Sequence, residues 1–245
     1  MKVIRCRNNN NRKVFGLLIA QVFCGVCPVL LLVFFVLLEL YEPQVLAIVV
    51  IVLIFLCNVA YGVLARRYNV LNSGRRGERQ LFKSIRHLDG NIIVFCNLPV
   101  RYKRGRSELD MLIISHKGII IIEAKNHSGT IQGSWKSDKW EQRKYYKNGQ
   151  QSVLEMDNPI KQMRRQRDIV KSILNSAGED VWIDSVLYFS NKNTKLKLNL
   201  RENDYVCLGS KELISFINGY DRGEIISKIQ MEKYARILND ARTKI

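Results

Sequence analysis

The sequence of 245 residues predicts an α/β domain around a mixed β-sheet, preceded by two transmembrane helices. Two observations carry this prediction. Two long apolar segments stand near the N-terminus, and after them short aliphatic runs alternate with segments of helical periodicity. The order after the apolar segments is helix, several strands, helix and strand, followed by peripheral elements.

Each of the two apolar segments is long enough to cross a bilayer. Residues 14–38 are apolar apart from Gln21, and residues 45–64 are apolar apart from Asn58. At about 1.5 Å per helical residue, each segment reaches about 30 Å or more. A signal peptide and a buried helical hairpin are the alternatives. The first apolar segment is too long for a signal peptide, and a soluble hairpin would need a partner covering it on every side.

Basic residues flank this hairpin on its outer sides, whereas the connection at residues 39–44 carries only acids. They are Lys2, Arg5, Arg7, Arg12 and Lys13 before it, and Arg66, Arg67, Arg75, Arg76 and Arg79 after it. By the positive-inside rule, both termini lie in the cytoplasm. We therefore expect a two-span protein of the bacterial inner membrane.

The composition is strongly basic. The chain has 39 Lys and Arg against 22 Asp and Glu, a formal charge of +17, which predicts attraction to nucleic acid or to an anionic membrane face. The six cysteines are scattered, so we expect them to be reduced. No glycine-rich phosphate-binding motif is present, which argues against nucleotide-driven chemistry.

The stretch from Asp110 to Lys125 carries the chemistry. It reads as two aliphatic strands joined by a turn at Gly118. Side chains alternate along a strand, so Glu123 and Lys125 share one face, and pairing as a hairpin brings Asp110 opposite the Glu123 end. Two carboxylates suit Mg²⁺, and Lys125 could orient a water or neutralise transition-state charge. This cluster predicts metal-dependent hydrolysis of a phosphodiester.

The remaining elements are assigned by pattern. Asn158 followed by Pro159 is a typical helix start, and Gly178 is placed to end that helix. The expected helices cover residues 78–88, 159–177, 211–218 and 224–243. The expected strands cover residues 91–98, 110–115, 119–125, 130–135, 140–146, 182–190 and 204–208.

Basic and aromatic residues are interleaved outside the hairpin, and such surfaces can hold phosphates and stack bases. The alternative is that these are solvated edge strands and an exposed helix face. The nucleic-acid-binding candidates are Arg104, Arg106, Lys136, Lys139, Trp140, Arg143, Lys144, Lys161, Arg164 and Arg165.

An ordered set of motifs over about residues 75–190 resembles the nuclease-related domain (NERD) family of the PD-(D/E)xK nuclease-like superfamily. Leu109 stands where the nominal motif has proline. The motifs are Gly77-Glu78, Asp110, Lys117-Gly118, Ile122-Glu123-Ala124-Lys125-Asn126, Ser128-Gly129, Trp140 and Asn158-Pro159-Ile160-x-Gln162.

The resemblance implies a restriction-endonuclease-like mixed sheet flanked by helices. It implies that Asp110 and Glu123 bind Mg²⁺ or Mn²⁺, that Lys125 is catalytic, and that Glu78 and Gln162 support the active site. We expect a basic tail and transmembrane hairpin over residues 1–71, the nuclease-like domain over 72–195, and a strand with helices packed on it over 196–245.

The resulting hypothesis is a membrane-anchored nuclease that acts on the cytoplasmic side, on DNA ahead of RNA, with room for a homo-oligomer. The alternative is a catalytically inactive membrane-anchored module that binds nucleic acid or serves as a scaffold. A third reading is an anchored assembly or sensing protein whose positive charge serves anionic lipid.

Overall fold

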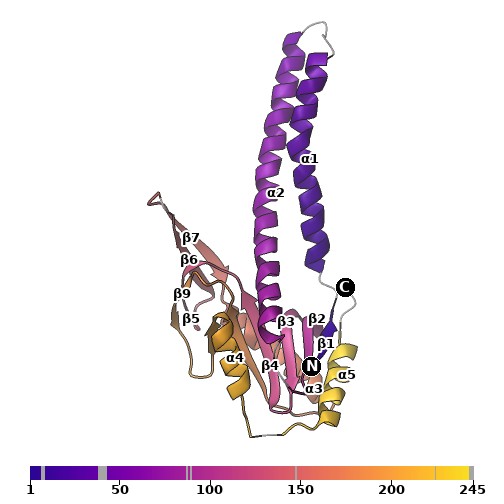
Figure 1. The fold of residues 1–245 in the computed structure, drawn as a ribbon, viewed down its shortest axis with the longest axis vertical. Coiled ribbons are helices and arrows are strands. Elements are labelled where there is room, and N and C mark those ends of the chain that lie inside the picture. The colour runs from indigo at the N-terminus through magenta and orange to yellow at the C-terminus, as the bar shows by residue number, and fades with distance from the viewer. Residues whose placement is uncertain are drawn as a thin grey trace. The chain divides into compact units, whose positions relative to one another are not determined.

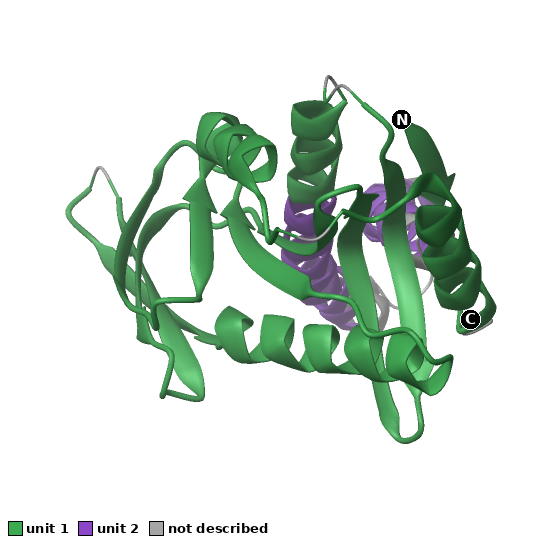
Figure 2. Ribbon diagram, turned by 90° about the horizontal axis from the view of Figure 1, so that it is seen from below, with its two compact units in different colours: residues 1–7, 76–245 green, residues 8–75 purple. Residues whose placement is uncertain are grey.

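The computed structural model describes residues 1–6, 9–37, 43–86, 88, 90–146, 148–223 and 225–242. The chain divides into two compact units, one of residues 8–75 and one of residues 1–7 with 76–245 (Figure 2). The prediction of a mixed α/β fold with two N-terminal apolar helices is confirmed.

The first unit is a pair of helices, α1 (Asn9–Leu37) and the first part of α2 (Pro43–Ile85). Both helices are long and apolar enough to cross a membrane, and almost none of their apolar surface is buried. Asn58 donates a hydrogen bond to the Ile54 carbonyl of its own helix at 2.8 Å. The acidic connection lies largely outside the described residues.

Helix α2 differs from the prediction, because the expected span over 45–64 and the expected helix over 78–88 form one continuous element. A separate helix was expected to begin at residue 78, yet no proline interrupts the chain between the span and that residue. Glycine alone weakens a helix by about 1 kcal/mol, which good helix formers on either side can offset. Residues 76–85 of α2 belong to the second unit.

The second unit contains a six-stranded mixed sheet in the order β1-β2-β3-β4-β8-β10 (Figure 1). β2, β3 and β4 form an antiparallel meander, and the other neighbours pair in parallel. The strands are β1 (Lys2–Arg5), β2 (Ile93–Tyr102), β3 (Gly105–Ser115), β4 (Gly118–Lys125), β8 (Ile183–Phe189) and β10 (Tyr205–Leu208).

Helices cover both faces of this sheet (Figure 2). One face packs its buried aliphatic residues against α3 (Pro159–Ser176) and α5 (Lys228–Asp240). The other face packs against the end of α2 and against α4 (Gly209–Gly219). Because β3 and β4 are buried on both sides, they read as nearly unbroken aliphatic runs in the sequence.

A smaller sheet has the order β7-β6-β5-β9. Its strands are β5 (Gly129–Ser134), β6 (Lys139–Tyr145), β7 (Gln151–Asp157) and β9 (Thr194–Asn199). A third core cluster, which includes Ile131, Trp140 and Phe189, joins the inner face of this sheet to α3 and to the end of β8.

Three strands were not expected from the sequence. β1 occupies part of the segment assigned to a basic tail, and it pairs in parallel with β2. β7 and β9 are polar and largely exposed, so they lack an apolar signal. Each of the three lies at the edge of its sheet, where one side of the strand needs no partner.

Asn158 fixes the start of α3. Its Oδ1 accepts hydrogen bonds from the N–H groups of Ile160 and Lys161, while its Nδ2 donates to the carbonyls of Ser134 and Ser137. The side chain is only 2 % exposed. One residue therefore caps the helix and ties it to the turn between β5 and β6.

Asn158→Ala is expected to lower stability by about 2 kcal/mol, because the cap is lost together with the hydrogen bonds from its buried amide to the Ser134 and Ser137 carbonyls. The matched control is Ser227→Ala, which removes the exposed cap of α5 and should cost about 1 kcal/mol. Thermal unfolding followed by tryptophan fluorescence compares the two proteins. Equal losses would show that the bonds to Ser134 and Ser137 contribute nothing.

Candidate functional site

The strands β3 and β4 separate at one end of their ladder, and the candidate site lies at this fork. Their last paired residues are Met111 and Ile122. Beyond that pair, β3 continues beside β2 only and β4 continues beside β8 only. Asp110 and Glu123 are the first residues past the fork on the two strands.

The backbone on the other side of Asp110 is also irregular. The β2–β3 ladder pairs Cys96 with Met111 and Leu98 with Leu109, and it skips the rung between them. Asn97 stands at that rung with a φ of 53°, in the left-handed region. Such sparsely populated conformations concentrate at functional sites, so the irregularity supports the location.

Asp110 turns across the fork to β4. Its Oδ2 accepts a hydrogen bond from the Ala124 N–H at 2.8 Å. Burial raises the pKa of Asp110 well above its ordinary value, and the charge of Glu123 raises it further. Lys125 and the Ala124 N–H act in the opposite direction. The two carboxylates are therefore close enough to repel each other.

Glu123 is 2 % exposed and has both carboxylate oxygens bonded. Oε1 accepts from Lys125 Nζ at 2.6 Å, and Oε2 accepts from Gln166 Nε2 at 2.8 Å. Lys125 also donates to Gln162 Oε1 at 3.1 Å. Burial by itself would lower the pKa of Lys125, but the attraction of Glu123 and Asp110 outweighs it, so the pKa is raised.

Glu78 enters the site from α2. A Cβ at Gly77 would lie 3.1 Å from the Cβ of Asn126, so the helix packs closely against the residue after Lys125. The charge of Glu78 contributes to the raised pKa of Asp110. The structure joins Asp110, Glu123, Lys125 and Gln162 through hydrogen bonds, and it places Glu78 near enough for its charge to act on Asp110.

Gln166 was not identified from the sequence. It lies one helical turn after Gln162 on α3, and it is completely buried. The spacing of four residues puts both glutamines on one face of the helix, and this was the signal that could have found it. The sequence alone does not show that Gln166 points to the site, because this depends on which face of α3 is buried.

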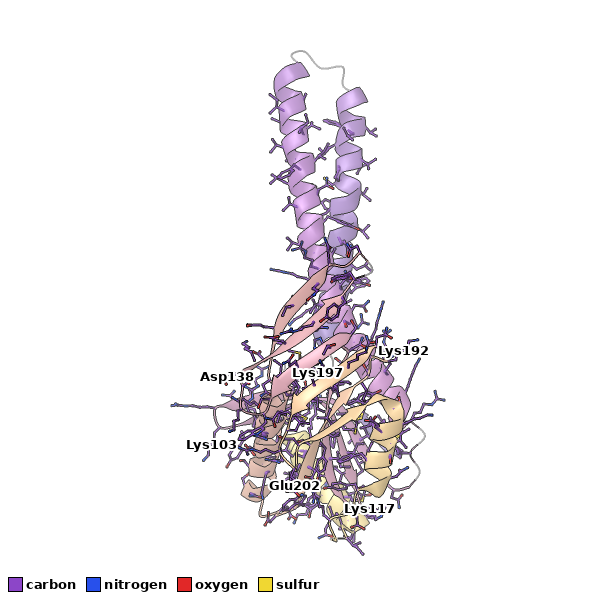
Figure 3. All side chains as sticks on the ribbon, turned by 90° about the vertical axis from the view of Figure 1, so that its left-hand side faces the viewer. Lys103, Lys117, Asp138, Lys192, Lys197 and Glu202 are labelled. Atoms are coloured by element: carbon purple, nitrogen blue, oxygen red, sulfur yellow. The ribbon has the colours of Figure 1, made fainter. Side chains whose placement is uncertain are left out.

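The basic candidates fall into two groups. Arg104 and Arg106 lie on the β2–β3 turn, whose Gly105 packs on α3 with a Cβ position 3.3 Å from Ile169. A groove of about 410 Å³ between the turn and the helix is lined by Lys161, Arg164 and Arg165. Figure 3 locates this turn by the label on Lys103.

The second group lies on the smaller sheet and the turn before β6. A groove of about 580 Å³ on this sheet is lined by Lys139, Arg143 and Lys197, the last labelled in Figure 3. Lys136 is exposed before β6, and Lys144 is half-buried on it. These residues do not line the groove beside α3.

Trp140 does not lie on the surface. It is 1 % exposed, its Nε1 donates to the Ser134 carbonyl, and its ring fills the space above Gly133, where a Cβ would lie 2.3 Å away. The ring therefore cannot stack on a base, contrary to its place among the nucleic-acid-binding candidates. Alternation along β6 turns Trp140 toward the core of the smaller sheet.

Several of the basic candidates are neutralised within the domain. The ion pairs are Lys139 with Asp157, Lys161 with Asp138, Arg143 with Glu141, and Arg164 with Asp204. Among the described residues, no ion pair is formed by Arg104, Arg106, Lys136, Lys144 or Arg165. This second set has charge available for a phosphate backbone.

The donor set at the fork suits a hard cation with few protein ligands. The described part of the chain contains no cluster of three or more His, Cys, Asp or Glu side chains arranged to hold a metal. Mg²⁺ commonly takes one or two carboxylates and keeps several waters. Asp110 and Glu123 could hold it, since burial and the charge of Glu123 both raise the pKa of Asp110, and a cation would offset the second of these effects.

Residues 73–190 match the family model of the nuclease-related domain. Neither the curated proteins nor the solved structures contain a match to the chain. The matched residues include the end of α2, both strands of the fork and the whole of α3. Residues 73–190, just under half of the chain, therefore form a nuclease-related (NERD) domain.

Proposed function

We propose that this protein is a membrane-anchored, Mg²⁺-dependent nuclease that hydrolyses phosphodiester bonds of DNA on the cytoplasmic side. The observation that carries this proposal is the cluster of Asp110, Glu123 and Lys125 at the β3–β4 fork of a NERD domain. The intact set of two acids and one ammonium favours an active enzyme over an inactive scaffold.

Asp110 and Glu123 would hold the metal ion. When bound, Mg²⁺ would supply Lewis-acid polarisation of a phosphoryl oxygen and a nucleophile at neutral pH. The two acids would also exclude other anions from the fork, so that the phosphodiester can approach only when a cation balances their charge.

Lys125 is suited to stabilise the transition state. Its raised pKa keeps the ammonium charged at neutral pH, and its side chain is 20 % exposed while that of Glu123 is 3 % exposed. The ammonium can therefore reach a substrate while the carboxylate stays buried. Gln162 holds Lys125 Nζ from the other side and so fixes where the positive charge acts.

The orientation in the membrane is supported by two features. Basic residues flank the apolar hairpin on its outer sides. Residues 1–7 also belong to the same compact unit as residues 76–245, which requires both ends of the hairpin to emerge on one side of the membrane. The catalytic domain then faces the cytoplasm.

Asp110→Ala and Glu123→Ala are each expected to reduce cleavage by at least about 100-fold, because each removes a proposed metal ligand. DNA binding should be largely retained. Full-length protein is incubated with circular DNA, linear DNA and RNA, with Mg²⁺ or Mn²⁺, beside an Asp240→Ala control at the exposed end of α5. Cleavage that survives both substitutions would refute the site, and binding without cutting in all proteins would favour the scaffold.

Asp110→Asn is expected to raise the melting temperature of the metal-free protein by a few degrees at pH 8. A carboxyl whose pKa is raised on folding stabilises the fold fully at low pH, and that stability is lost as the pH rises through the folded pKa. Removing the charge restores it. The gain should vanish near pH 4, and a gain that is the same at both pH values would contradict this origin.

Arg104→Ala combined with Arg165→Ala is expected to weaken DNA binding and to reduce the slope of log K against log salt by about 2, if each arginine contacts one phosphate. Fluorescence anisotropy over a range of salt concentrations measures the slope. Lys211→Ala, an exposed change on α4, is the control. An unchanged slope would remove the groove beside α3 from the binding surface.

A further inference from the structure

Gln166 spans the fork between the two strands that carry the acids. Its Nε2 donates to the Glu108 carbonyl on β3 at 3.1 Å and to Glu123 Oε2 on β4 at 2.8 Å. The side chain is completely buried between α3 and the sheet. One amide group therefore links the strands where their own ladder has ended.

The hydrogen bond from Gln166 reaches Glu108 at a place where the sheet is irregular on both sides of β3. The partner of Glu108 across the ladder on β2 is Pro99, which has no N–H to donate. On the other side, β4 no longer pairs with β3 at this position. The Gln166 amide supplies a hydrogen bond to β3 where the ladder with β4 has ended, so it stabilises the divergence of the strands.

The orientation of the amide is set by its two acceptors. Its Nε2 faces both of them, and its Oε1 is buried with no hydrogen-bond partner among the residues that the structure describes. The reverse orientation would set an oxygen against a carbonyl and a carboxylate. The site therefore requires a neutral group that donates twice, which glutamine provides and glutamate does not.

We infer that Gln166 is a positioning residue that fixes the Glu123 carboxylate and the width of the β3–β4 fork, and thereby sets the geometry in which Asp110 and Glu123 share a cation. The inference rests on the proposed function for its metal. Gln166 acts through Glu123 and takes no part in the chemical step.

The test compares Gln166→Met and Gln166→Asn with the wild-type full-length protein in detergent. Mn²⁺ affinity is measured directly by titration calorimetry. Glu123→Gln removes a proposed metal ligand, so the heat that this variant still gives comes from Mn²⁺ binding outside the site. Loss of a group that orients a metal ligand commonly costs 10- to 100-fold. We expect the Kd for Mn²⁺ to rise by about 10-fold or more, and kcat to fall while KM for DNA stays unchanged.

Gln142→Met is the matched control. Gln142 is also a buried glutamine, 5 % exposed, and its Nε2 donates to a backbone carbonyl, that of Ser128. Its loss should lower the melting temperature without changing Mn²⁺ affinity. Gln166→Asn keeps an uncharged amide that is too short to reach both acceptors, so it provides a second folded variant if Gln166→Met does not fold.

The outcomes separate the inference from the proposed function. Wild-type Mn²⁺ affinity in the Gln166 variants, with only a lower melting temperature, would overturn the inference, and so would a wild-type protein that binds no Mn²⁺. Weaker Mn²⁺ binding in the Gln166 variants supports it whether or not the protein cuts DNA. A wild-type protein that binds Mn²⁺ but cuts no nucleic acid would overturn the proposed function alone.

Discussion

The buried carboxylate of Glu123 is the constraint on which the rest of the domain depends. An ionised group with almost no exposure is tolerated only when its oxygens are paired, and here an ammonium takes one oxygen and an amide takes the other. The amide belongs to Gln166 on α3, so a shift of that helix by one turn along the sheet would remove it from Glu123. The buried cap at Asn158 and the third core cluster hold the helix in this position by joining the start of α3 to the smaller sheet.

The close approach of Asp110 and Glu123 lowers the stability of the folded domain in favour of the proposed function. Two neighbouring carboxylates, one of them with a raised pKa, disfavour the folded chain at neutral pH, and the proposed cation would offset this cost. Lys125 offsets part of this repulsion from the same face of β4. The aliphatic strands β3 and β4 keep these charged groups close together. Both strands are buried on both faces, so they cannot move apart without exposing apolar surface.

The sequence was informative where the signal is local. Alternation along β4 placed Glu123 and Lys125 on one face, the aliphatic runs predicted the central strands, and Asn158 with Pro159 predicted the start of α3. The remainder depends on tertiary contacts. The role of Gln166 depends on its hydrogen bond to the Glu108 carbonyl, 58 residues away in sequence. Trp140 is buried because Gly133 leaves room for its ring. β1 is a strand because it pairs with the edge of β2.

The strand β1 has a consequence for how the protein is made. It is synthesised before both apolar helices, while its partner β2 is synthesised after them. If only one helix of the pair entered the membrane, β1 and β2 would lie on opposite sides of it. The edge of β2 would then have no partner strand. Open edges recruit other chains, so a wrongly inserted copy would present a surface for aggregation or for quality-control proteases. Under the proposed membrane insertion, completion of the sheet would therefore depend on both helices having entered the membrane.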